Sequence, residues 1–159
     1  MIRLLQPARR EIAELYRSAT YRGFPLEEDA IPSRVIVDQA IRTADTSDLG
    51  YRWSVPFLIL FEPTACIAGS IGGKGLLEGE EEVELGYNVA LNYRRKGIAT
   101  RAIGQMCALA KADALGLLAH VETGNHPSRR ALLHNGFVLD EIVRLPASLD
   151  LERWTWSAD

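Results

Sequence analysis

A cluster of positive charge in front of one helical pattern is the feature of this sequence best suited to chemistry. Arg94, Arg95 and Lys96 are consecutive. Gly97 follows them, and apolar residues at helical spacing begin immediately afterwards. A helix N-terminus carries unpaired backbone N–H groups and a partial positive charge, and a glycine there lets an anion approach the backbone closely. The turn therefore predicts an anion-binding site; a basic turn exposed to solvent is the alternative.

The spacing within this turn excludes two common phosphate-binding motifs. A P-loop needs G-x-x-x-x-G-K-[ST] and the dinucleotide fingerprint needs G-x-G-x-x-G, and neither occurs in the sequence. The turn instead reads R-x-x-G-x-A, from Arg94 through Gly97 to Ala99. Its chemistry must therefore be judged from the elements that position it.

A strand, a helix and a second strand surround the turn. Residues 82–91 alternate, with Val83 and Leu85 beginning one face and Glu84 beginning the other. Residues 97–115 have helical spacing, and residues 117–123 read as the next strand. This order predicts a crossover within a mixed α/β fold.

The remaining segments complete that pattern. A helix opens near Pro7, with Ile12, Leu15 and Ala19 at helical spacing, and residues 21–33 read as a loop. A second helix follows Ser33. Its expected apolar face consists of Val35, Ile36, Ala40 and Ile41. Asn125 caps a short helix, and the other predicted strands are 1–5, 54–61, 65–73, 137–145 and 151–157.

Composition excludes several classes of protein. The 159 residues suit one domain, 1–159, and a net charge of −3 argues against a nucleic-acid partner. No apolar run reaches the roughly 18 residues of a membrane span, and the charged N-terminus does not resemble a signal peptide. Cys66 and Cys107 fall within predicted elements, which favours core positions and a reducing, cytoplasmic location.

Two motifs, in this order, resemble those of the GNAT superfamily of N-acetyltransferases. The turn Arg94-x-x-Gly97-x-Ala99 is similar to its (Q/R)-x-x-G-x-(G/A) signature, and NHPSRRALLHNGF (125–137) is similar to its N-x-x-S…GF element. The second motif is typical of the subgroup that includes ribosomal-protein N-terminal acetyltransferases. The strand ELGYNV (84–89) also resembles the central strand of the family.

The resemblance implies a mixed, mostly antiparallel sheet, splayed between strands 82–91 and 117–123, with helices on both faces. It implies acetyl-CoA as co-substrate, with the pantetheine arm added to a bulged central strand and the Val89 N–H as oxyanion donor. Asn125 matches a cofactor-contacting residue of the family, although a plain helix cap explains it equally well. The implied pyrophosphate site consists of Arg94, Arg95, Lys96, Gly97, Ile98, Ala99 and Thr100.

Acetylation of an amine needs a base, because an ammonium must lose a proton before it attacks. Glu84 is the candidate, since it shares the Gly86 face of the strand and lies five residues before Val89. An exposed glutamate in the run 80–84 is the alternative reading of this residue. His120, on the neighbouring strand, is the next candidate.

The leaving thiolate needs a proton donor, and the usual one is missing here. Many family members place a tyrosine seven residues after the motif asparagine, where this sequence has Leu132. Ser128, at the N-x-x-S position, is the candidate acid, and a first-turn helix residue is its alternative role. His134 is expected on the outer face of the short helix.

The resemblance implies an N-acetyltransferase in which a primary amine, from a peptide N-terminus or a small molecule, attacks acetyl-CoA directly. The acidic segments 27–29 and 79–84 would attract cationic amines to the cleft. The histidines lack a ligand pattern, so no metal is expected. The alternatives are a non-catalytic acyl-CoA-binding module and an interaction domain that uses exposed Trp154 and Trp156. A homodimer stays open.

Overall fold

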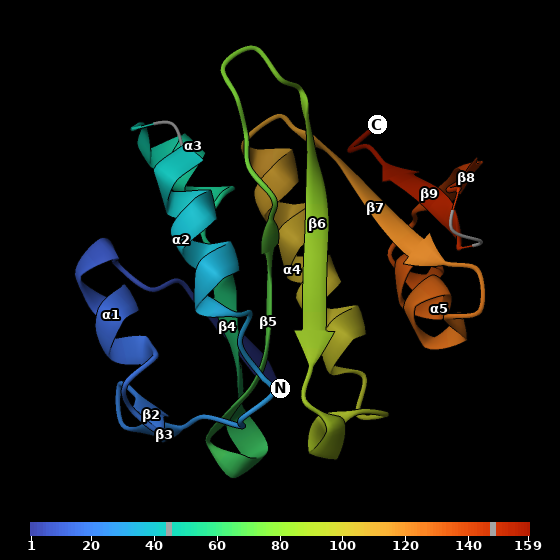
Figure 1. Cartoon of the computed structure of the whole chain (residues 1–159). Coiled ribbons are helices and arrows are strands. Elements are labelled where there is room, and N and C mark those ends of the chain that lie inside the picture. Colours follow the sequence, from blue (N-terminus) through green and yellow to red (C-terminus); the bar gives the residue numbers. More distant parts are fainter. Residues whose placement is uncertain (44–45, 147–148) are drawn as a thin grey trace.

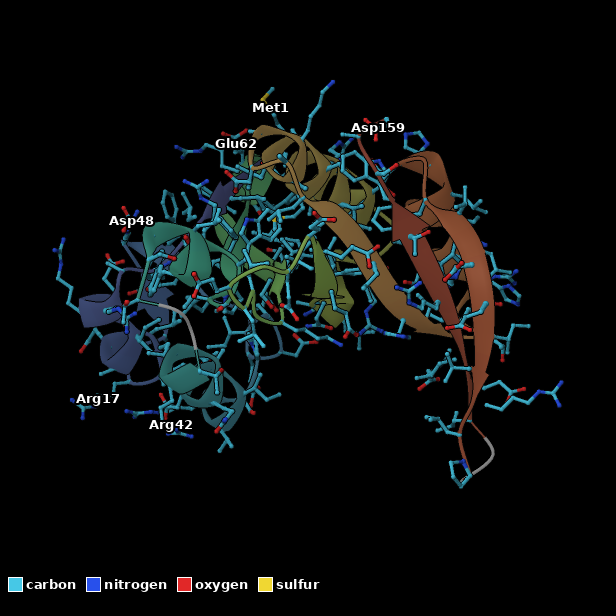
Figure 2. The ribbon with its side chains drawn as sticks, turned by 90° about the horizontal axis from the view of Figure 1, so that it is seen from above. Met1, Arg17, Arg42, Asp48, Glu62 and Asp159 are labelled. Atoms are coloured by element: carbon cyan, nitrogen blue, oxygen red, sulfur yellow. The ribbon has the colours of Figure 1, made fainter. Side chains whose placement is uncertain are left out.

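One seven-stranded sheet organises the chain in the computed structural model, which describes residues 1–43, 46–146 and 149–159 (Figure 1). Its strands are β1 (Ile2–Leu5), β4 (Phe57–Phe61), β5 (Cys66–Gly73), β6 (Glu82–Val89), β7 (Gly116–Glu122), β8 (Val138–Arg144) and β9 (Asp150–Trp156). They lie in the order β1-β4-β5-β6-β7-β9-β8. Every neighbouring pair is antiparallel except β6 and β7, which confirms the predicted mixed, mostly antiparallel sheet. The β8–β9 hairpin forms one end of the sheet, next to β7, and extends to one side of the molecule (Figure 2).

Helices cover both faces of this sheet, with α2 in front of it and α4 behind it in Figure 1. The helices are α1 (Ile12–Leu15), α2 (Arg34–Thr43), α3 (Asp48–Arg52), α4 (Ile98–Ala112) and α5 (His126–His134). Short 3-10 turns are η1 (Arg9–Glu11), η2 (Glu62–Thr64) and η3 (Leu91–Tyr93), and a small ladder joins β2 (Thr20–Tyr21) to β3 (Phe24–Pro25). In the part of the chain that the structure describes, no helix is long and apolar enough to cross a membrane.

The main core lies between β6 and α4, as the alternation of β6 and the spacing of α4 predict. Val83 and Leu85 are buried on the α4 side of the sheet. The buried stripe of α4 consists of Ile98, Ala102, Ile103, Met106, Cys107 and Ala110. Burying these side chains contributes roughly 25 cal/mol for each Å² of apolar surface removed from water. This packing fixes α4, and hence its N-terminus, against the central strand.

The first helix and the face of α2 differ from expectation. The helix at Ile12 lasts a single turn, because the chain then turns into the β2–β3 ladder. In α2, Val37 is buried, whereas Val35 and Ile36 are 76% and 63% exposed. An apolar stripe through Val37 and the half-buried Ile41, four residues apart, turns these two side chains toward solvent.

Trp154 also differs from expectation, because it is buried, whereas the sequence predicts an exposed position. Its relative exposure is 3%, and its indole N–H donates to the buried carboxylate of Glu152 at 3.0 Å. The strand that carries it, β9, is flanked by β7 and β8 and so has no free edge. The half-buried Trp156 does not form an exposed pair with it, and the expected contact surface is not present.

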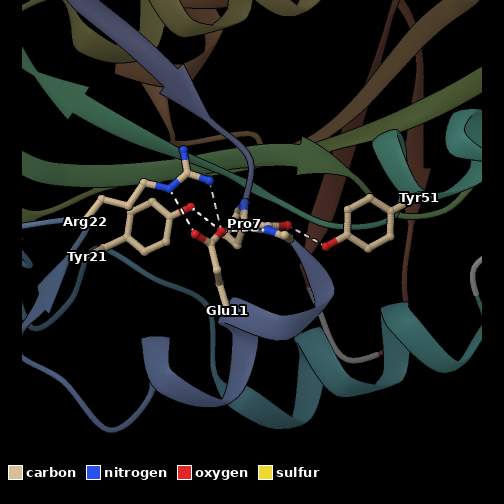
Figure 3. Close-up of polar contacts among 6 residues, drawn as sticks. Pro7, Glu11, Tyr21, Arg22 and Tyr51 are labelled. Carbon is tan, nitrogen blue, oxygen red and sulfur yellow. Dashed lines mark hydrogen bonds and ion pairs between the residues drawn. The ribbon is translucent and has the colours of Figure 1, made fainter.

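A polar network holds the N-terminal segment to the β2–β3 ladder (Figure 3). The Glu11 carboxylate accepts hydrogen bonds from two Arg22 guanidinium nitrogens, each at 3.0 Å, and from the Tyr21 hydroxyl at 2.9 Å. It also accepts from the backbone N–H of Ala8 at 2.8 Å. The hydrogen bonds from Arg22 and Ala8 lower the pKa of Glu11 from 4.5 to about 2. This network anchors the loop that leads into α2.

Glu11→Gln is expected to lower the free energy of unfolding at pH 7 by about 1–2 kcal/mol, because it removes a charge-assisted pair. The folded-state pKa of Glu11 is depressed, so its contribution is present above pH 4.5 and is lost as pH falls through about 2. Urea unfolding at several pH values should therefore show the difference from wild type closing across that window. Glu14→Gln, at an exposed position three residues away, is the control and should change stability little. A constant difference down to pH 2 would contradict this assignment.

Candidate cofactor cleft and catalytic site

The site begins where β6 and β7 separate. Their parallel pairing joins Glu82–Glu84 to Gly116–Leu118 and ends there. The backbone N–H of Lys74 donates to the Glu84 carbonyl at 2.8 Å, so this even-numbered residue of β6 bonds toward β5. Backbone groups point to alternating sides along a strand. The N–H and C=O groups of Tyr87 and Val89 therefore face the side of β7, in the stretch where β7 has moved away.

The resemblance implies a bulge in this central strand, and the structure places the irregularity elsewhere. The β5–β6 register runs without a shift from Gly73↔Leu85 to Gly69↔Val89. The shift lies between β4 and β5, where Ile59 and Leu60 face Gly69 and Ile67 and Ala68 is the extra residue. The divergence of β7 is therefore what leaves one edge of β6 open.

The cationic turn lies at the end of this open edge. Gly97 is the N-cap of α4 and has a φ of 71°, in the left-handed region that favours glycine. Arg101 holds the turn, because its guanidinium donates to the Lys96 carbonyl at 3.0 Å. The Arg94 side chain turns back, and its Nε donates to the Val89 carbonyl at 3.0 Å. Arg94 therefore links the turn to β6, in addition to any contact with an anion.

A cleft of about 1420 Å³ connects the open edge of β6 with the cationic turn. This volume exceeds the roughly 300–1,000 Å³ of pockets for drug-sized ligands, so the cleft suits a long ligand. The predicted site residues that line it are Val89, Arg94, Arg95, Gly97, Ile98, Ala99, Thr100, Asn125 and Ser128. Among the described residues that form its wall, two predicted ones are missing: Lys96, which is exposed, and Glu84.

Helix α5 forms the opposite wall and is fixed at both ends. The Asn125 side chain accepts from the Ser128 backbone N–H at 3.2 Å, so it caps the helix. Arg129 forms an ion pair with the buried carboxylate of Glu152 on β9 at 3.1 Å. Near the C-terminus of the helix, Asn135 donates to the Thr100 carbonyl of α4 at 2.9 Å. These contacts hold Ser128 in place beside the cleft.

Glu84 lies on the Gly86 face of β6, where it contacts the side chains of Lys74 and His120 but does not itself line the cleft. One of its carboxylate oxygens is 2.6 Å from Lys74 Nζ and 3.0 Å from His120 Nδ1, and both partners line the cleft. Burial raises the pKa of Glu84, but the hydrogen bonds from Lys74 and His120 outweigh burial and leave the pKa below its usual value. Glu84 is therefore a carboxylate at neutral pH, and the adjacent imidazole is the group that faces the cleft.

Tyr87 is a site residue that the sequence analysis missed. Its hydroxyl is hydrogen-bonded to the Ser128 hydroxyl, and both residues line the cleft. Burial raises the pKa of Tyr87, although the bond from Ser128 works in the opposite direction. Leu132, at the usual tyrosine position, is fully buried in the core and has no polar group to offer. The strand alternation places Tyr87 on the apolar face, and that pattern conceals a polar role.

His134 also lies differently from expectation, because it lines the cleft instead of an outer face. Pro127, Arg130 and Ala131 line the cleft as well, and they lie seven, four and three residues before His134, respectively. This spacing defines one face of a helix, so the sequence did contain the signal. His134 itself remains exposed to solvent.

The two acidic segments lie at opposite ends of β6 (Figure 1). Glu80 accepts from the Leu77 backbone N–H at 2.9 Å, so in the 79–84 run it serves the β5–β6 turn. Asp29 lies near the other end, where its carboxylate accepts from the Leu91 N–H at 2.9 Å and its carbonyl accepts from the Asn88 side chain at 2.5 Å. The loop before α2 is thereby tied to the end of β6, beside the cleft.

Comparison with known proteins identifies the family. Residues 2–138 match the model of the acetyltransferase (GNAT) domain. The chain belongs to the GNAT family of acetyltransferases. None of the curated proteins matches it significantly.

Solved structures share this GNAT fold at low sequence identity. The microcin C7 self-immunity acetyltransferase MccE, in complex with acetyl-CoA and AMP, is 16% identical, with a TM-score of 0.62 over 98% of this chain and 92% of its own. A spermidine N-acetyltransferase chimera of Vibrio cholerae SpeG and hSSAT is 13% identical, with a TM-score of 0.68 over 98% and 95%. The Salmonella typhimurium enzyme that modifies the N-terminal serine of ribosomal protein L7/L12 is 12% identical, with a TM-score of 0.68 over 99% and 95%. A Bacillus anthracis GNAT acetyltransferase is 20% identical but aligns over 64% of this chain and 65% of its own, with a TM-score of 0.57.

Gly97→Val is expected to weaken CoA binding at least tenfold, about 1.4 kcal/mol, because a branched side chain blocks approach to the α4 N-terminus. Gly79→Val is the matched control, since Gly79 has a similar φ of 86° and nothing within 4 Å of an added Cβ. Both variants place a valine in the left-handed region and are strained by it, but only the Gly97 variant adds its side chain at the cleft. Calorimetric titration with CoA measures the difference. Equal affinities for the two variants would remove the basis for an anion site at this turn.

Proposed function

We propose that this GNAT protein transfers the acetyl group of acetyl-CoA to a primary amine by direct attack. The observation that carries the proposal is the open edge of β6 leading to the glycine-capped N-terminus of α4. An extended pantetheine arm can pair with such an edge as an added strand, and a diphosphate suits such a helix N-terminus. Enzymes of this family use acetyl-CoA, which matches both halves of the cleft.

In this proposal the backbone amides from Arg95 to Thr100 bind the pyrophosphate, and Arg94 and Lys96 add positive charge. The Val89 N–H points toward the opening and donates to the thioester oxygen as negative charge develops there. Asn125 contributes a polar side chain to the cofactor wall while also capping α5. The support for these roles is the shared cleft and the direction of the β6 backbone.

The proposed base is the pair formed by Glu84 and His120. Because the Glu84 carboxylate lies at the Nδ1 side of the His120 ring, it favours the tautomer with hydrogen on that nitrogen. The other ring nitrogen is then free to accept a proton from the amine. Glu84 provides the negative charge that stabilises the resulting imidazolium, as a carboxylate does for a catalytic histidine. In a simpler form of the same proposal, Glu84 itself accepts the proton of the amine through an ordered water molecule.

The proposed acceptor is a cationic amine, either a peptide N-terminus or a small molecule such as a polyamine. The acceptors named for two structural neighbours, spermidine and an N-terminal serine, are both of this kind. The serine in the N-x-x-S position favours the ribosomal-protein subgroup. The Lys74 ammonium contacts the Glu84 carboxylate, and the ammonium of an incoming acceptor would replace it there. A non-catalytic acyl-CoA-binding module is the competing proposal, favoured by Leu132.

An acceptor screen with acetyl-CoA separates these proposals. Peptides, polyamines, aminoglycosides and amino acids are each incubated with the protein, and released CoA thiol is measured. Release with an amine supports the transferase. Tight binding of acetyl-CoA without release from any acceptor would favour the binding module.

We also propose a reducing, cytoplasmic location. Cys66 and Cys107 are both free and buried. Burial raises the pKa of the Cys107 thiol to about 11, so it stays protonated and unreactive at neutral pH.

Glu84→Gln is expected to keep acetyl-CoA affinity and to lower kcat at pH 7 by roughly 10²-fold, the usual effect of losing a base. Its kcat should rise more steeply toward high pH than the wild-type value, because the amine then loses its proton without help. His120→Gln should give the same profile if the two residues act as one unit. A pH–rate profile for Glu84→Gln that matches wild type would place the base elsewhere.

A further inference from the structure

We infer that the hydroxyl pair of Tyr87 and Ser128 is the proton donor for the thiolate that leaves during acetyl transfer. Ser128 is the group that contacts the sulfur, and Tyr87 is a positioning residue that acts through it. The inference rests on the proposed acetyltransferase function and adds a residue from the central strand to that site. It also supplies a proton donor in a cleft where position 132, the usual place of the donor tyrosine, holds a buried leucine.

The two residues come from opposite walls of the cleft. Tyr87 lies two residues before Val89, whose N–H is the proposed oxyanion donor, on the same edge of β6. Ser128 lies in the first turn of α5, and its backbone N–H is held by the Asn125 side chain. Their hydroxyls meet across the opening between strand and helix. A thioester held by Val89 would place its sulfur beside this pair.

Counting hydrogens explains why two hydroxyls are needed. The pair has two O–H hydrogens, and the bond between the oxygens uses one of them. When Tyr87 donates to the Ser128 oxygen, the Ser128 hydrogen remains free to point into the cleft. A serine alone in the first turn of a helix can instead donate to a backbone carbonyl nearby. The hydrogen bond from the Tyr87 hydroxyl to the Ser128 oxygen holds the serine hydroxyl at the cleft.

The chemical step balances with no further reactant. The amine nitrogen forms a bond to the thioester carbon, the C–S bond breaks, and its electron pair leaves with the sulfur. The free hydrogen of the pair passes to the sulfur, which leaves as the thiol. The proton given up by the attacking nitrogen then returns to the pair through water in the cleft. Burial of Tyr87 supports this order, because its raised pKa keeps the hydroxyl protonated at neutral pH before the step.

Three variants test the pair: Tyr87→Phe, Ser128→Ala and the double variant. We expect kcat to fall about tenfold for Tyr87→Phe and about 10²-fold for Ser128→Ala, with the KM for acetyl-CoA within about twofold of wild type. The double variant should be no slower than Ser128→Ala, because residues that act as one unit are not additive. Ser128→Thr keeps the hydroxyl and should restore most of the rate. Tyr16→Phe, which removes a hydroxyl bonded to the Pro32 carbonyl outside the cleft wall, controls for loss of a tyrosine hydroxyl elsewhere.

A change of leaving atom separates proton donation from simple packing. The selenoester analogue of acetyl-CoA leaves as a selenolate, which needs no proton because selenols are much stronger acids than thiols. With this donor the kcat defects of Tyr87→Phe and Ser128→Ala should shrink to less than about threefold. Equal defects with both donors would mean that the pair only positions the cofactor, and the inference would be wrong.

The outcomes also separate this inference from the proposed function. Wild-type kcat in both single variants, with an amine still acetylated, would overturn the role of the pair and leave the transferase intact. A wild-type protein that binds acetyl-CoA but releases no CoA with any amine would overturn both.

Discussion

The early end of the β6–β7 pairing is the feature on which the rest of the site depends. After Glu84 the two strands separate, because β7 stays paired with β9 along its length, from Leu117 to Glu122. The ion pair between Arg129 and Glu152 fixes α5 to the same strand, β9. The amides left without a strand partner on β6 each give up a hydrogen bond with a net worth of about 1 kcal/mol, although they keep access to water. That open edge is what a ligand with amide groups can complete.

The open edge also distributes the chemistry between two faces of one strand. Even-numbered side chains of β6 face the proposed acceptor side, where Glu84 meets His120 and Lys74. Odd-numbered side chains face α4 and α5, where Tyr87 meets Ser128. Alternation along the strand therefore places the proposed base and the proposed acid on opposite faces of the opening. A thioester in the opening would have a proton acceptor on the side of the amine and a proton donor on the side of the sulfur.

The sequence was sufficient to predict those features that depend on residues close together along the chain. The alternation of residues 82–91 predicted the burial of Val83 and Leu85, and helical spacing predicted the buried stripe of α4. The cap by Asn125 and the cationic turn before Gly97 are likewise local features. Each of these depends on backbone geometry over a few residues, which residue type and spacing determine directly.

The missing parts depend on contacts between distant residues. Tyr87 and Ser128 are 41 positions apart, and Glu84 and His120 are 36 apart. Alternation tells which face of β6 a side chain occupies, but it does not tell what lies opposite that face. Trp154 is buried because it belongs to the main core cluster, together with Ala119 of β7 and Leu132 of α5, and no local pattern in the sequence predicts that packing.

Hydrogen exchange at single amides of β6, with and without CoA, tests the open edge directly. The Tyr87 and Val89 amides should exchange at least tenfold more slowly when CoA is bound, because they gain a hydrogen-bond partner. The Gly86 and Asn88 amides, which already face β5, should change little. Binding of CoA that leaves exchange at Tyr87 and Val89 unchanged would contradict the claim that this edge holds the cofactor.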